Sequence, residues 1–101
     1  MKKNYEVRLQ NPKKYKLNHY RMFVVKYLGA TEQKGSRVKI NDTRRAESVT
    51  ISFDYRMDTI RDIAIQYLLN KKIKIEGFTT ADGLYYLMTS DFETSLKEDR
   101  R

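Results

Sequence analysis

The chain has 101 residues, of which 40% are hydrophobic and 34% charged, and its formal net charge is +8. This composition is typical of one folded domain with a modest core, and it excludes a globally disordered chain. The lack of cysteine excludes disulfides, zinc–thiolate sites and thiol nucleophiles, and the apolar runs are too short to span a bilayer. We therefore expect a cytoplasmic protein that does not enter a membrane.

Positive charge is concentrated at the N-terminal end, where residues 1–21 carry seven basic side chains and one acidic side chain. Tyr5, Val7 and Leu9 alternate with polar residues, which is typical of a short edge strand. Pro12 and the lysines around it are instead typical of an arm that becomes ordered on a partner. Both interpretations of this segment stay open.

Three strands are predicted next. Residues 21–29 are apolar on both faces, which indicates a central strand. Residues 36–41 and 48–54 alternate apolar and polar side chains, and the polar segment 42–47 between them predicts a hairpin loop. Because a slip by one residue would expose the apolar side chains, we expect a fixed register.

A helix is predicted after these strands. Thr59 followed by Asp62 resembles an N-terminal capping box, and Lys71 and Lys72 suit the negative C-terminal end of a helix. Between them, apolar residues recur with helical spacing and form one stripe that faces the core: Ile60, Ile63, Ala64, Tyr67 and Leu68.

The C-terminal part predicts two more strands, 73–78 and 84–89, joined by a turn at Ala81-Asp82-Gly83. Ser90 and Glu93 then predict the cap of a short final helix that buries Phe92 and Leu96.

Together these elements predict an α+β fold of two layers, in which one main helix packs against an antiparallel sheet. The order is β-β-β-α-β-β, with or without an additional N-terminal strand and with a short C-terminal helix. The expected organisation is a basic N-terminal arm or edge strand at 1–21, a single α+β domain at 22–98, and a frayed tail at 99–101.

The segment Gly29–Ser36 contains two glycines, a lysine and a serine, but it does not match a nucleotide-binding P-loop. Five residues separate the glycines, Lys34 precedes the second glycine, and a strand follows where a helix is needed. We interpret the segment as a hairpin loop in which Gly35 supplies a positive φ.

Basic residues near tyrosines and hydroxyls form the candidate binding site, because cations contact phosphates and aromatic rings stack on bases. Arg37 and Lys39 share the polar side of one strand, next to Ser48, Thr50 and Ser52 of the next. The alternative is an ordinary solvated sheet face. The candidate nucleic-acid-binding residues are Lys13, Lys14, Tyr15, Lys16, Tyr20, Arg21, Lys34, Arg37, Lys39, Arg44 and Arg45.

Candidates for catalysis are weak. His19 is the only histidine, and we interpret it as solvated or phosphate-facing. Asp54, Asp58 and Asp62 could hold magnesium in a small nuclease, but Asp58 and Asp62 also suit the first turn of a helix. We expect no enzyme, no catalytic residue, no metal site and no cofactor.

The sequence therefore favours a small non-enzymatic module that binds nucleic acid through its basic arm and a basic sheet face. The alternative is a phage or mobile-element protein that inhibits a host nuclease complex, in the manner of anti-CRISPR proteins. In that case its partner would be an acidic or nucleic-acid-binding groove of a host protein.

Overall fold

The computed structural model describes residues 3–9 and 13–96, which form seven strands and one helix. The elements are β1 (Lys3–Leu9), β2 (Lys13–His19), β3 (Arg21–Leu28), β4 (Arg37–Asp42), β5 (Glu47–Ser52), α1 (Ile60–Asn70), β6 (Gly77–Ala81) and β7 (Leu84–Thr89).

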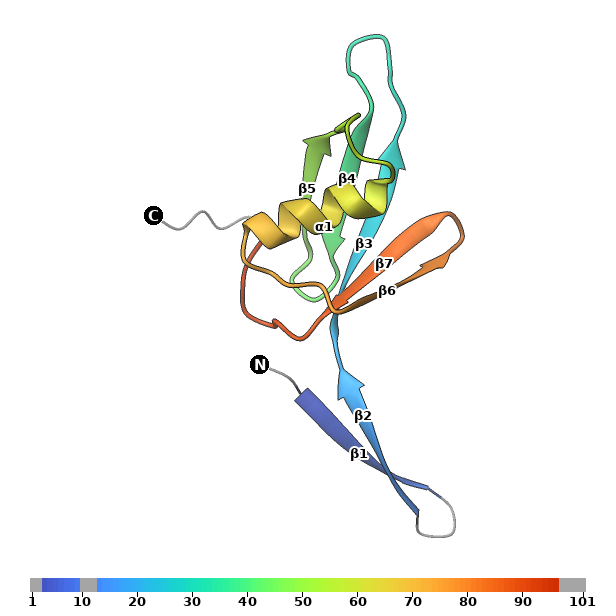
Figure 1. Ribbon diagram of the computed structural model, residues 1–101, viewed down its shortest axis with the longest axis vertical. Helices are drawn as coiled ribbons and strands as arrows, with labels where there is room; N and C mark the ends of the chain where they lie inside the picture. The colour runs from blue at the N-terminus through green and yellow to red at the C-terminus, as the bar shows by residue number, and fades with distance from the viewer. Residues whose placement is uncertain (1–2, 10–12, 97–101) are drawn as a thin grey trace.

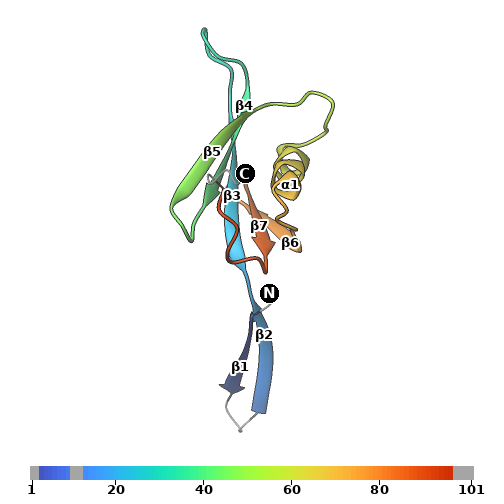
Figure 2. The same ribbon diagram turned by 90° about the vertical axis from the view of Figure 1, so that its left-hand side faces the viewer.

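Five of these strands form one antiparallel sheet in the order β5-β4-β3-β7-β6, and α1 packs on one of its faces (Figures 1 and 2). From β3 onward the order is β-β-β-α-β-β, so the predicted two-layer α+β fold is confirmed. The central position of β3 follows from its side chains, which are apolar on both faces.

The core lies between the sheet and α1 because alternate residues of the strands point to that side. Phe23 and Val25 of β3, Val38 and Ile40 of β4, and Leu87 of β7 are buried there against Ile63, Ala64 and Leu68 of the helix. The predicted apolar stripe of the helix is therefore confirmed.

Both ends of α1 follow from local chemistry. The hydroxyl of Thr59 accepts a hydrogen bond from the backbone N–H of Asp62, so Thr59 is the N-cap as predicted. At the other end Lys72 has a φ of 69°, and the N–H of Ile73 reaches back to the carbonyl of Leu68. These bonds satisfy carbonyls that the end of a helix would otherwise leave open.

Residues 3–9 and 13–19, for which the sequence leaves an edge strand and an arm open, form a separate two-stranded hairpin. β1 and β2 pair from Lys3 opposite His19 to Leu9 opposite Lys13. The chain then runs through Tyr20 into β3, so the hairpin extends away from the sheet (Figure 1). We call this hairpin the arm.

The predicted short C-terminal helix is wrong for the part that the structure describes, residues 90–96, which are irregular. The Asp91 carboxylate binds the N–H groups of Glu93 and Thr94, while Arg21 and Arg45 occupy the carbonyls of Asp91, Glu93 and Thr94. Since side chains satisfy these backbone groups, no helical ladder forms. Phe92 and Leu96 are nevertheless buried, as predicted.

The strand predicted at 73–78 lies further toward the C-terminus in the structure, where β6 covers Gly77–Ala81. The side chain of Ile73 is instead drawn into the core below α1. The turn prediction is confirmed: Asp82 and Gly83 both have positive φ, 53° and 77°, and join Ala81 to Leu84 in register.

Candidate nucleic-acid interface

The sheet face opposite α1 carries a cluster of cations. Cross-strand partners share a face, and Lys26 lies directly opposite Lys39, with Arg37 two residues before Lys39 on the same strand. Lys39 in turn lies opposite Thr50, and Arg37 opposite Ser52. We call Lys26, Arg37 and Lys39 the basic patch.

Nothing in the described part of the chain covers this face. The helix lies on the other side (Figure 2), and so does the segment 91–96, because Leu96 packs into the helix-side core. Lys26 and Lys39 are exposed, whereas Arg37 is half-buried and donates from Nε to the carbonyl of Gly35 at 3.2 Å. The basic patch is therefore accessible to a ligand.

None of the five strands carries a carboxylate on the open face. The register places Asp42 and Glu47 of β4 and β5 on the helix side, where Asp42 binds Arg21 and Glu47 binds Ser95. None of the ion pairs found among the described residues involves the basic patch. Two lysines that face each other across strands without a carboxylate repel each other, so the patch is electrostatically suited to an anion.

The same face is apolar toward β7. Met22 lies opposite Met88, and Val24 lies opposite Tyr86, which in turn faces Thr79 of β6. All four of the β3 and β7 side chains are partly accessible. The open face thus combines cations over β3 and β4 with an aromatic and apolar area over β3 and β7.

Two of the candidate residues, Arg37 and Lys39, belong to the basic patch, beside the hydroxyl-bearing face of β5 that alternation predicts. Lys34 lies in the loop 29–36 at the same end of β4, where its N–H donates to Thr31 Oγ1 at 3.0 Å. The strand β4 follows this loop, as the sequence predicts, and not the helix that a P-loop requires. The expectation that Gly35 has a positive φ is wrong, since Gly83 is the glycine with this conformation in the described chain.

Arg44 and Arg45 lie elsewhere, in the loop at the opposite end of β4. The Arg44 guanidinium stacks 4.9 Å from the ring centroid of Phe92, and Arg45 donates to the carbonyl of Glu93 at 2.6 Å. Both arginines therefore hold the C-terminal segment on the helix side and do not join the basic patch.

The interpretation of Arg21 as a nucleic-acid contact is wrong, because its side chain is buried with 2% exposure. It forms an ion pair with Asp42, with Nη2 and Oδ2 2.5 Å apart, and donates to the carbonyls of Asp91 and Thr94. A buried guanidinium needs such partners, since its charge is costly to desolvate. Arg21 fastens the C-terminal segment to the sheet.

The arm holds the remaining candidates. Lys16 lies opposite Glu6 and both are exposed. The Tyr20 hydroxyl accepts from Asn18 at 3.2 Å. Lys13, Lys14 and Tyr15 lie on the β2 backbone, but their side chains fall outside what the structure describes. The ring of His19 is half-buried and packs 5.1 Å from that of Phe92, so His19 is not fully solvated, and its interpretation as phosphate-facing stays a prediction.

Lys26 is the patch residue that the sequence interpretation misses. Its strand is apolar on both faces, which marks the strand as central but hides the one polar position near its end. The signal that identifies Lys26 is its register with Lys39, which depends on the length of the 29–36 loop.

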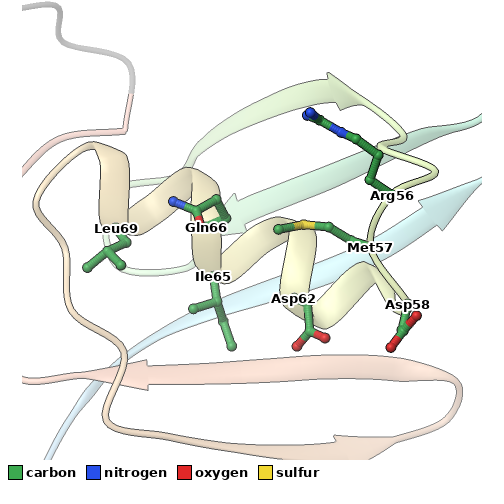
Figure 3. Close-up of a pocket in the computed structure, with 7 residues that line it drawn as sticks. All are labelled: Arg56, Met57, Asp58, Asp62, Ile65, Gln66 and Leu69. Carbon is green, nitrogen blue, oxygen red and sulfur yellow. The ribbon is translucent and has the colours of Figure 1, made fainter.

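A second feature is an open groove of about 410 Å³ beside α1 (Figure 3). It is lined by Arg56, Met57, Asp58, Asp62, Ile65, Gln66 and Leu69. Asp54, the third carboxylate of the predicted cluster, is instead bound by Arg56, whose guanidinium lowers the pKa of Asp54 below its ordinary value. Within the described ranges, no three His, Asp or Glu side chains lie close enough together to hold a metal ion.

Comparison with protein families, with curated proteins and with solved structures finds no significant match to this chain. In the described part of the chain, the single helix is too short to cross a bilayer.

Proposed function

We propose that the protein binds nucleic acid through the open face of its sheet. The observation that carries this proposal is the direct opposition of Lys26 and Lys39, next to Arg37, on a face where none of the five strands carries a carboxylate. Directly opposed Cβ atoms are about 5 Å apart, so both ammonium groups can contact one phosphate group or two neighbouring phosphates. The patch arginine adds a fork of donors that suits phosphate oxygens.

Two neighbouring features support the proposal. Ser52 and Thr50 bring hydroxyls beside the cations, and hydroxyls commonly contact phosphate oxygens. Tyr86, on the same face, offers an aromatic ring on which an unpaired base can stack. The arm carries additional lysines, which increase the long-range attraction between the protein and a polyanion. A non-enzymatic role is part of the proposal.

The test is fluorescence anisotropy with short single- and double-stranded DNA and RNA over a range of salt concentrations. We compare the wild-type protein with a triple variant, Lys26→Gln, Arg37→Gln and Lys39→Gln. Each phosphate contact contributes a slope of about 0.7–0.9 in log K against log salt, so the triple variant should reduce the slope by about 2–3. Affinity at low salt should fall accordingly.

The matched control replaces three cations on the helix side of the sheet: Arg56→Gln, Lys71→Gln and Lys72→Gln. Arg56 pairs with Asp54, and Lys71 lies 5.7 Å from the ring centroid of Tyr67. The control loses the same net charge as the patch variant. A difference in binding between the two triple variants therefore reflects the position of the cations and not their number. Equal losses in the two triple variants would contradict a defined interface, and so would tight binding that ignores salt.

The apolar half of the open face favours a second candidate, a protein partner. Met22, Val24, Tyr86 and Met88 are side chains of the kinds found in protein interfaces, and the patch would meet acidic groups at the rim. This role corresponds to an inhibitor that occupies a nucleic-acid-binding groove. If purified protein binds none of the four nucleic acids at low salt, photo-crosslinking from position 86 in cells tests this candidate.

A further inference from the structure

We propose that the outer edge of β5, which no other described strand pairs with, joins β5 of a second copy of this chain, so that two five-stranded sheets become one. This inference goes beyond the proposed function and does not depend on it. It is drawn from the backbone of β5, which forms one edge of the sheet.

The hydrogen bonds of β4 and β5 show which backbone groups of β5 are free. The N–H of Phe53 donates to the carbonyl of Ser36 at 3.1 Å, and this pair continues the β4–β5 register one residue beyond Arg37 opposite Ser52. Bonded and non-bonded pairs alternate along antiparallel strands, so Ile51 and Val49 also bond toward β4. The N–H and carbonyl groups of Ser48, Thr50 and Ser52 therefore point outward.

This edge lacks the features that normally prevent pairing. Between Glu47 and Phe53 the sequence is Ser-Val-Thr-Ile-Ser, without a charge or a proline, and its register with β4 is continuous, without a bulge. Exposed edges of soluble proteins usually carry lysine, proline or a bulge, because such an edge otherwise recruits another strand. The edge is suited to β-strand addition.

The edge is also complementary to itself. If two copies meet antiparallel about Thr50, each Ser48 faces Ser52 of the other copy, and all outward backbone groups find partners. The same register places Val49 opposite Ile51 of the other copy on the helix side. Both side chains are only partly buried in the single chain, so pairing extends the core across the junction.

Repulsion between two basic chains does not prevent this pairing. In the joined sheet, Lys39 and its counterpart would be three strand spacings apart, about 14 Å. This exceeds the screening length of about 8 Å at physiological salt. No charged side chain lies in the paired segment itself, so the nearest like charges are screened.

Sedimentation of the nuclease-treated protein tests the inference. We expect a reversible dimer whose fraction rises with concentration, and a Thr50→Pro variant that stays monomeric. Proline at this position removes an outward N–H but no bond to β4. Thr50→Val, which keeps the N–H, should dimerise like the wild type. A wild type that remains monomeric at every concentration would overturn the inference, as would unchanged dimerisation of Thr50→Pro.

Cysteine cross-linking tests the β5 junction even if the Thr50→Pro variant fails to fold. The chain has no cysteine, so Thr50→Cys introduces a single thiol at the centre of the proposed junction. Paired Cα atoms about 5.5 Å apart permit a disulfide. We expect Thr50→Cys to form a covalent dimer under mild oxidation much faster than Thr79→Cys on the opposite edge strand, β6. Equal rates, or faster linking through position 79, would exclude the β5 junction.

Discussion

Arg21 shows how one buried side chain determines the course of a whole segment. Its guanidinium binds the Asp42 carboxylate and two carbonyls about 70 residues further along the chain, with sequence separations of 70 and 73. Asp42 in turn accepts from the N–H groups of Arg44 and Arg45. A charged pair thus joins β3, the β4–β5 loop and the C-terminal segment.

Removing only one partner of this pair should be costly, because the other charge stays buried. We expect Asp42→Asn and Arg21→Met each to lower the free energy of unfolding by about 3–5 kcal/mol in urea denaturation. The double variant Arg21→Met with Asp42→Asn should lose less than the sum of the two single losses. Purely additive losses would mean that the pair contributes no coupling energy.

Asp91 is a second single residue with a large effect, because it makes the stability of the fold depend on pH. Burial by itself raises the pKa of Asp91, but hydrogen bonds from Glu93 and Thr94, together with the nearby Arg21, lower it overall below its ordinary value of 3.8. A carboxyl with a lowered folded pKa stabilises the fold above its unfolded pKa, and this stability is lost as pH falls through the folded value. The effect therefore lies below about pH 4.

We expect the melting temperature of the wild type to fall as pH is lowered from 5 to 2.5, and the fall to be smaller in Asp91→Asn. Asparagine keeps an acceptor for the Glu93 and Thr94 N–H groups but does not titrate. Thermal melts by circular dichroism at several pH values measure this difference. If the melting temperatures of the two proteins fell in parallel with pH, the loss of stability in acid would come from other carboxylates.

At the scale of elements, the start of α1 depends on one side chain. Thr59 has extended backbone angles, φ −139° and ψ 159°, and its hydroxyl accepts from the N–H of Asp62 at 3.1 Å. We expect Thr59→Ala to lower the free energy of unfolding by about 1 kcal/mol in urea, and Thr59→Ser to restore most of it. An equal loss in both variants would point to the methyl group of the threonine and not to the cap.

Elements set by short-range chemistry are the ones that the sequence predicts well. The cap at Thr59, the Asp82-Gly83 turn and the alternating strands each depend on neighbouring residues, and all are found where the pattern places them. The segment 90–96 fails because arginines distant in sequence bind its carbonyls. A capping pattern cannot reveal that competition.

The candidate site could be predicted only in part, for a related reason. Alternation within β4 places Arg37 and Lys39 on one face, but the neighbour of Lys39 on β3 depends on the register across an eight-residue connection. Charge counting also treats every cation as available. It cannot distinguish the buried Arg21 from the exposed Lys26, because burial is decided by the packing of the whole molecule.

At the scale of the molecule, the arm and the sheet are separate in their strand pairing, and His19 at the end of the arm packs against Phe92. β1 and β2 pair with each other and with no other described strand, and the molecule extends over 60 Å along its longest axis. An isolated two-stranded hairpin is marginally stable in water, and no described residue of the arm belongs to the core of the sheet, so we expect the sheet to be stable without the arm. The sheet has its own core between the strands and α1.

Deleting residues 1–18 should therefore separate stability from electrostatics. The deletion keeps His19 against Phe92 and removes six basic side chains and one acidic side chain, so the formal net charge falls from +8 to +3. We expect the deletion to change the free energy of unfolding by less than about 1 kcal/mol. Since 1 kcal/mol corresponds to roughly 4–8 °C at this size, the melting temperature should stay within a few degrees of the wild type.

Nucleic-acid affinity at low salt should fall in the truncated protein, while the basic patch still provides salt-dependent binding. Combining the truncation with the triple variant of the patch should then abolish binding, because no cluster of cations remains on the open face. Anisotropy titrations of the four proteins, the wild type, each single change and their combination, measure this. Undiminished affinity without the arm would place the whole interface on the sheet, whereas complete loss with the patch intact would place it on the arm.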